Sequence, residues 1–151
     1  MINTRRAVSL IKKAEDAFSS AIDDFKAGRY PDCVFSCQRC VEFATKSVLL
    51  TLGYLIPKSH DTSGVLGKAM TEKEMPEWFK EEIPKLGRIV NKLADQRVKS
   101  EYGLEVEGVW IDPYDIIDEG TASSTIEEAE WVLKLCSKFL IESGISDLRM
   151  K

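Results

Sequence analysis

Three polar residues in this sequence recur at a spacing that suits the binding of a charged ligand. Gln38, Glu42 and Lys46 follow one another at every fourth position, inside a segment that is otherwise typical of an apolar helix. An amide, a carboxylate and an ammonium then share one stripe of that helix. Such a stripe is either a solvated face or a row of hydrogen-bonding groups directed at a ligand or a partner.

A second candidate pair, Arg97 and Tyr102, lies where a later helix is predicted to end. An arginine is favourable at a helix C-terminus because it faces the negative end of the helix dipole. Its planar guanidinium is equally suited to hold a phosphate. In that case Tyr102 would stack or hydrogen-bond beside it, and Lys99 would add positive charge. Both interpretations stay open at this point.

His60 is the single histidine of the chain, so chemistry that needs two histidines is excluded. It follows Pro57 and precedes a short predicted helix, and we expect it to hydrogen-bond with the backbone at that junction. The sequence contains no P-loop, no G-x-G-x-x-G and no H-E-x-x-H pattern. We therefore expect no cofactor.

Three cysteines have the spacing C-x3-C-x2-C, which radical enzymes use to hold an iron–sulfur cluster: Cys33, Cys37 and Cys40. Here the spacing falls inside a predicted helix, where it places the three thiols on one face. Free cysteine packs as a small buried hydrophobe, whereas tetrahedral metal sites usually take ligands from more than one element. We predict core packing and no metal site.

The acidic residues are concentrated in one part of the chain. Residues 101–130 hold ten of the 25 carboxylates and no Lys or Arg, which leaves 15 acidic against 21 basic groups elsewhere. The residues outside 101–130 therefore carry a net positive charge and could bind phosphates, although the whole chain has a net charge of -4. No apolar run is long enough to span a membrane, no secretory signal is visible and no DNA-specific motif occurs. We expect a single cytoplasmic domain over residues 1–151.

Apolar residues recur at helical spacing through most of the chain, and strand-like alternation is almost absent. Glycine and proline separate the periodic segments. The region 103–123 holds several of these residues and is predicted to be a long loop. The predicted helices cover about 3–27, capped by Asn3 or Thr4, 31–52, a short one from 61 or 62, 83–100, and a last one capped by Ser124 or Thr125 and ended by Gly144. The fold class is therefore an all-α, up-and-down bundle of about five helices.

The order of several weak motifs resembles the HEPN domain family. The first helix ends in Asp24-Phe25-Lys26-Ala27-Gly28-Arg29-Tyr30, like the family's a-x-x-g-x-y pattern, and the stripe from Gln38 to Lys46 matches its Q-x3-E-x3-K run. His60 opens the short helix as in the family's H-x4-L pattern, with Leu66 close to the expected leucine, and the segment 97–102 is similar to the arginine-plus-tyrosine segment. The resemblance covers nearly the whole chain.

The resemblance implies a four-helix core with a short helix, a homodimer, and a minimal nucleotidyltransferase as partner in a toxin–antitoxin-like pair. Ribonuclease members of the family use an R-x4-6-H motif. Arg97 matches its arginine, but Tyr102 stands where the histidine is needed. His60 lies far upstream, so we expect no robust catalysis.

Three hypotheses follow for the function. In the first, the protein binds nucleotide or RNA phosphates through Arg97, Lys46, Tyr102 and His60, with Gln38 and Glu42 positioning them, and docks the nucleotidyltransferase. In the second, it is a ribonuclease toxin that uses Arg97 with Tyr102 in place of the histidine. In the third, it is purely an interaction module.

Overall fold

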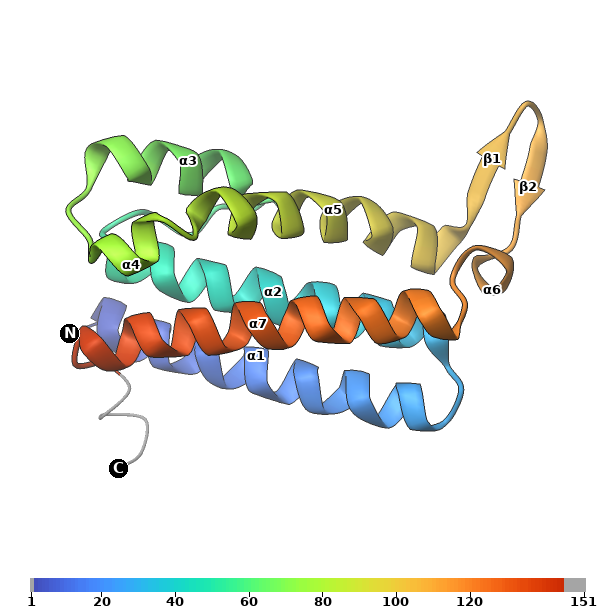
Figure 1. The fold of residues 1–151 in the computed structure, drawn as a ribbon, viewed down its shortest axis with the longest axis horizontal. Helices are drawn as coiled ribbons and strands as arrows, with labels where there is room; N and C mark the ends of the chain where they lie inside the picture. Colours follow the sequence, from blue (N-terminus) through green and yellow to red (C-terminus); the bar gives the residue numbers. More distant parts are fainter. Residues whose placement is uncertain (1, 146–151) are drawn as a thin grey trace.

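Four long helices form the body of the molecule in this computed structural model, which describes residues 2–145 (Figure 1). They are α1 (Ile2–Lys26), α2 (Tyr30–Thr51), α5 (Ile83–Tyr102) and α7 (Glu119–Glu142). They lie side by side along the long axis, and α2 packs against each of the other three. The all-α bundle predicted from the sequence is confirmed.

The shorter elements lie at the two ends of this bundle. Helices α3 (Ser63–Glu72) and α4 (Glu77–Lys80) cover one end, and α3 packs on α5. At the other end the strands β1 (Leu104–Val106) and β2 (Val109–Ile111) pair antiparallel, and α6 (Pro113–Ile116) follows them. Five helices have ten residues or more in the part that the structure describes, in agreement with the prediction of about five.

The local sequence explains why α1 ends and α2 begins where they do. Gly28 has a positive φ of 77°, a conformation that ends a helix and that glycine adopts at little cost. Pro31 then stands in the first turn of α2, where its missing N–H leaves no helical hydrogen bond unmade. The two helices therefore turn back on each other and pack along their length.

The core lies between the facing sides of the four long helices. Cys33, Cys37, Cys40 and Cys136 are free thiols buried within it, as predicted for the first three. Burial raises the pKa of Cys40 to about 12, and Glu15 nearby adds to this effect. Among residues 2–145, no group of three or more His, Cys, Asp or Glu side chains is arranged to hold a metal ion.

The region predicted to be a long loop is instead largely ordered secondary structure. Residues 103–118 form the hairpin and α6, and α7 begins at Glu119 rather than after Ser124. The cap of α7 is Asp118, whose carboxylate accepts from the backbone N–H of Thr121 at 2.8 Å. Thr125 lies within the helix, and its hydroxyl donates to the carbonyl of Thr121. The predicted capping box was therefore wrong because an acidic cap lies six residues earlier in the chain.

The first helix also begins earlier than predicted. Helix α1 starts at Ile2, so Asn3 and Thr4 lie in its first turn and are not its cap. Met1 and residues 146–151, which belong to the predicted domain 1–151, lie outside the described residues. Within the described part, no helix is both long and apolar enough to cross a membrane.

Candidate phosphate-binding site around Glu42

The polar stripe of α2 is part of the interior and is not a solvated face. Gln38, Glu42 and Lys46 are all buried, although two of them carry a charge. Buried charges are tolerated only when they are paired and hydrogen-bonded. The stripe must therefore find its partners within the bundle, and these partners come from two distant parts of the chain.

Glu42 is the centre of this network. Its Oε2 accepts from Nζ of Lys46 at 2.7 Å, and its Oε1 accepts from Nε2 of Gln38 at 3.1 Å and from Nδ1 of His60 at 2.8 Å. Burial alone would raise the pKa of Glu42, but the hydrogen bonds from these three side chains outweigh it and hold that pKa below its ordinary value. Glu42 is therefore an ionised carboxylate inside the protein.

His60 lies in the segment that joins α2 to α3, and its side chain is 54% exposed. It does not bond with the backbone at the helix junction, as the sequence had suggested, but with the carboxylate of Glu42. Its own carbonyl accepts from Nε2 of Gln38 at 3.4 Å. Because an ionised carboxylate only accepts, Nδ1 carries the hydrogen and Nε2 is left to accept a proton.

Arg97 reaches the same network from α5. One of its terminal nitrogens donates to Oε1 of Gln38 at 2.7 Å and lies 3.9 Å from Oε1 of Glu42. The guanidinium also stacks over the ring of Phe35 at 4.4 Å, and its Nε lies 3.4 Å from Glu101. With 19% of its side chain exposed, Arg97 is held in one geometry at the edge of the bundle.

The network brings together five of the six residues that the sequence singled out. Lys46 takes a different place from the one expected, since its ammonium is buried against Glu42 and does not line the surface. The sequence analysis missed Phe35 and Glu101. Glu101 could have been found from its i, i+4 spacing to Arg97, whereas nothing local distinguishes Phe35 from other apolar residues of α2.

Tyr102 stands apart from the network. Its side chain is 70% exposed, and within residues 2–145 no hydrogen bond joins its hydroxyl to Arg97 or His60. It lines a shallow cavity of about 340 Å³ together with Phe35 and Glu101, both of which contact Arg97. Tyr102 thus lies near Arg97, because Phe35 and Glu101 border both the cavity and the guanidinium, but it is not part of the Glu42 network.

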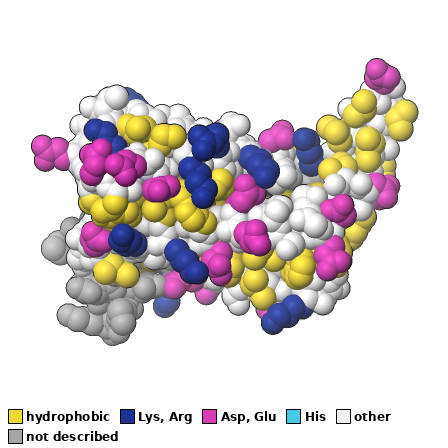
Figure 2. Space-filling view, in the orientation of Figure 1, with side chains coloured by type: hydrophobic (Ala, Val, Ile, Leu, Met, Phe, Trp, Pro, Cys, Tyr) yellow, Lys and Arg dark blue, Asp and Glu magenta, His cyan; other side chains and the backbone are white. Residues whose placement is uncertain are grey.

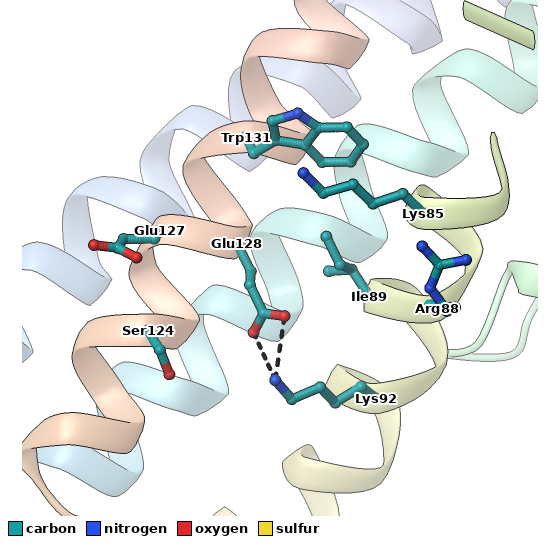
Figure 3. A pocket seen from close by; sticks show the side chains of 8 residues that line it. All are labelled: Lys85, Arg88, Ile89, Lys92, Ser124, Glu127, Glu128 and Trp131. Carbon is teal, nitrogen blue, oxygen red and sulfur yellow. Dashed lines mark hydrogen bonds and ion pairs between the residues drawn. The ribbon is translucent and has the colours of Figure 1, made fainter. Parts of the chain in front are cut away.

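A second and larger hollow lies between α5 and α7, with a volume of about 600 Å³ (Figure 3). Lys85 lies over the ring of Trp131 at 4.1 Å, and Lys92 pairs with Glu128 at 3.0 Å. The exposed Arg88 also lines this hollow, where it stands along α5, and it makes no ion pair or hydrogen bond within residues 2–145. This surface, here called the α5–α7 groove, is separate from the Glu42 network.

Fold and site together define the class of this protein. A family model described as the HEPN domain matches residues 7–140, and the chain belongs to the HEPN family. Its expected resemblance to that family is confirmed.

Two comparisons, one of sequence and one of structure, show which known proteins the chain is similar to. "Putative toxin MJ1304" of Methanocaldococcus jannaschii is 31% identical over 140 residues, which are 93% of this chain and 91% of that protein. The crystal structure of TT1696 from Thermus thermophilus has a TM-score of 0.65 and 18% identity, and the match covers 89% of this chain and 98% of that one. The structural match shows the shared fold.

Proposed function

We propose that this toxin-like HEPN protein binds phosphate groups of RNA or of a nucleotide at the edge where Arg97 and His60 meet. The observation that carries the proposal is that both side chains contact the same oxygen of Glu42, although they come from different elements. A guanidinium held in place by Gln38 and Phe35 loses little freedom when it binds an anion. The carboxylate of Glu42 is offset by the buried ammonium of Lys46.

Fluorescence anisotropy with a labelled single-stranded RNA, and titration calorimetry with ATP and GTP, test this proposal. We expect Arg97→Ala to weaken RNA binding and to lower the dependence of log Kd on log salt by about one unit. Arg6→Ala removes an exposed arginine of α1 and serves as the charge-matched control. Equal binding by the wild type and by Arg97→Ala would overturn the proposal.

The Glu42–His60 contact favours a second candidate function, the cleavage of RNA without a metal ion. Nε2 of His60 would take the proton of a ribose 2′-hydroxyl, and the 2′-oxygen would attack the phosphorus while the bond to the 5′-oxygen breaks. The imidazolium would then return the proton to the leaving 5′-oxygen, which yields a 2′,3′-cyclic phosphate and a 5′-hydroxyl. Arg97 would stabilise the charge that develops on the phosphate. In this mechanism His60 transfers the proton, which is the role that the second hypothesis gave to Tyr102.

Cleavage of a labelled RNA pool in the presence of a chelator distinguishes the two functions. His60→Asn keeps an amide donor for Glu42 but has no basic nitrogen, so it should weaken RNA binding less than Arg97→Ala does and reduce cleavage by about 10²- to 10⁴-fold. No cleavage by the wild type would leave phosphate binding as the function. Cleavage that is abolished by Tyr102→Phe but not by His60→Asn would return the role to Tyr102.

We further propose that the protein acts in the cytoplasm with a minimal nucleotidyltransferase. Membership of the HEPN family and the name of the M. jannaschii relative support this proposal, and the four free cysteines fit a reducing compartment. Co-expression with a nucleotidyltransferase encoded beside it, followed by size-exclusion chromatography, is the test. If the two proteins elute separately and RNA does not bind, the protein is best described as an interaction module with another partner.

A further inference from the structure

A shallow pocket lies beside Arg97 at the end of the bundle that carries the hairpin, where α2 begins and α5 ends (Figure 1). Its volume of about 340 Å³ falls at the lower end of the range of small-molecule sites, about 300–1,000 Å³. It is here called the Phe35–Tyr102 pocket, and its lining residues are Asp32, Phe35, Ser100, Glu101 and Tyr102.

The ring of Phe35 borders both this pocket and the guanidinium of Arg97. The guanidinium lies 4.4 Å from the centre of the ring, and the same ring lines the pocket. A ligand with two parts can therefore occupy both places at once. A nucleotide has this form, because one ribose joins its phosphate to its base. It can place the phosphate at Arg97 and the base in the pocket.

Tyr102 offers a second aromatic surface to the pocket. Its side chain is 70% exposed, and its hydroxyl makes no hydrogen bond within residues 2–145. The backbone beneath it is fixed, because its carbonyl accepts from the indole N–H of Trp110 at 2.8 Å. An aromatic side chain with a fixed backbone and an uncovered ring is suited to stack on an unpaired base.

The charges around the pocket distinguish the place of the base from that of the phosphate. Residues 101–119 contain seven carboxylates and no Lys or Arg, and acidic and hydrophobic side chains stand out on the hairpin in Figure 2. Lys99 is close in sequence, but its ammonium pairs with Asp95 at 2.9 Å. A phosphate is repelled by such surroundings, whereas an uncharged base is not. The charges therefore favour the phosphate at Arg97 and the base in the pocket.

The polar groups that line the pocket are mainly hydrogen-bond acceptors. Asp32 lies in the first turn of α2, and its carboxylate makes no hydrogen bond or ion pair within residues 2–145. Oε1 of Glu101 lies 3.4 Å from Nε of Arg97. The hydroxyl of Ser100 donates to the carbonyl of Arg97 at 2.7 Å, so its oxygen can still accept. A ligand that fills this pocket must therefore supply donors.

Guanine is the base whose donors fit this arrangement. Its Watson–Crick edge carries an N1–H and the N2 amino group side by side, and both can donate to one carboxylate. Adenine and cytosine place an acceptor nitrogen beside their amino group, and uracil places a carbonyl on each side of its N–H. Each of these bases would turn an acceptor toward a carboxylate, which only accepts. Asp32 has no other partner in the described part of the chain, so its two oxygens are available to guanine.

We propose that the Phe35–Tyr102 pocket binds an unpaired guanine, which stacks on Tyr102 and donates to Asp32 while Arg97 holds a phosphate. The inference deepens the proposed function and rests on it, since it names the base that accompanies the phosphate. Asp32 then determines the sequence preference, whereas Arg97 contributes equally to every sequence. Base pairing hides the Watson–Crick edge of guanine, so the pocket selects single-stranded RNA or a free nucleotide.

Titration calorimetry with GTP and ATP tests the proposal on the full chain, because the two nucleotides differ only in the base. A bidentate contact with a base changes Kd by about 5- to 150-fold, so the Kd for GTP should be at least about fivefold lower. Inosine triphosphate keeps the N1–H but lacks the N2 amino group, and its Kd should lie between the two. Fluorescence anisotropy with oligouridine RNA that carries one guanine or one adenine should give the same order. Equal Kd values for GTP and ATP would overturn the proposal.

Asp32→Asn tests the residue that reads the base. An amide both donates and accepts, so it fits adenine as well as guanine, and the ratio of the two Kd values should fall to about one. Asp16→Asn is the matched control, because Asp16 is an exposed residue of α1 without an ion pair in the described part of the chain. It removes the same charge and should keep the ratio. A preference for GTP that survives Asp32→Asn would overturn the proposal.

Two further variants test the stacking and separate this inference from the proposed function. Tyr102→Ala should raise the Kd of both nucleotides by about 5- to 150-fold, and Tyr102→Phe should bind them more tightly than Tyr102→Ala does. If GTP and ATP bind equally and Arg97→Ala weakens both, the phosphate site stands and the guanine pocket is wrong. If GTP is preferred but Arg97→Ala has no effect, the pocket stands and the phosphate site is wrong. If neither nucleotide nor RNA binds, both proposals are wrong.

Discussion

Nδ1 of His60 lies 2.8 Å from Oε1 of Glu42, and this contact ties the segment before α3 to the central helix of the bundle. The same oxygen lies 3.9 Å from a guanidinium nitrogen of Arg97 on α5. A single buried carboxylate therefore positions the two side chains that could act on a phosphate. Its charge has consequences for stability as well as for function.

Replacing Glu42 by Gln should destabilise the fold strongly. The substitution leaves the buried ammonium of Lys46 without its anion, and breaking a buried pair in this way costs about 3–5 kcal/mol. Urea unfolding followed by circular dichroism measures the effect. Glu130→Gln breaks the exposed pair with Lys134 and should change the free energy of unfolding by less than about 1 kcal/mol. Similar losses in the two variants would mean that the Glu42 pair is solvated in solution.

The lowered pKa of Glu42 predicts a specific loss of stability in acid. Its folded pKa lies below the ordinary value of 4.5, so the unfolded chain takes up the proton first as the pH falls. The contribution of Glu42 is complete above pH 4.5 and disappears as the pH falls through the folded pKa. The difference in unfolding free energy between the wild type and Glu42→Gln should therefore shrink below pH 4.5. A difference that is constant from about pH 7 to about pH 3 would contradict this prediction.

Gly103→Ala should disturb the base of the hairpin. The added Cβ would meet the carbonyl oxygen of Ile111 at 2.2 Å, in a backbone with φ of 75°. Gly28→Ala is a matched control, because Gly28 has nearly the same φ, 77°, but nothing within 4 Å of the added carbon. We expect the control to lose about 1–2 kcal/mol from the backbone alone and Gly103→Ala to lose more, as judged by thermal unfolding. An equal loss of stability in the two variants would show that the hairpin moves far enough to relieve the clash with the added Cβ.

The thiols should be unreactive in the folded protein. All four cysteines are buried and therefore shielded from the reagent. Burial raises the pKa of Cys40 to about 12 and also raises that of Cys136, whereas the hydrogen bond with Cys37 lowers the pKa of Cys33, so shielding and not charge protects Cys33. Ellman's reagent should modify the thiols at the rate of global unfolding and modify all four in denaturant. Metal analysis of the purified protein should find no stoichiometric iron or zinc. Rapid reaction under native conditions would mean that the helix pair α1–α2 opens locally.

The residues of the site were largely predictable, but their partners were not. Gln38, Glu42, Lys46 and Arg97 were found from spacing and from family resemblance, and each belongs to the network. Spacing along a helix, however, does not say whether a polar stripe faces water or the core. The stripe is buried because α5 and the segment before α3 pack over that side of α2.

The sequence by itself determined the helical bundle and most of its boundaries, because apolar periodicity, Gly28 and Pro31 act within a few residues of the chain. The hairpin escaped that reasoning, since its strands are only three residues long. Only the tertiary structure decided that His60 and Arg97 share the carboxylate of Glu42. Contacts between residues far apart in the chain depend on how the helices pack, and no local pattern encodes that packing.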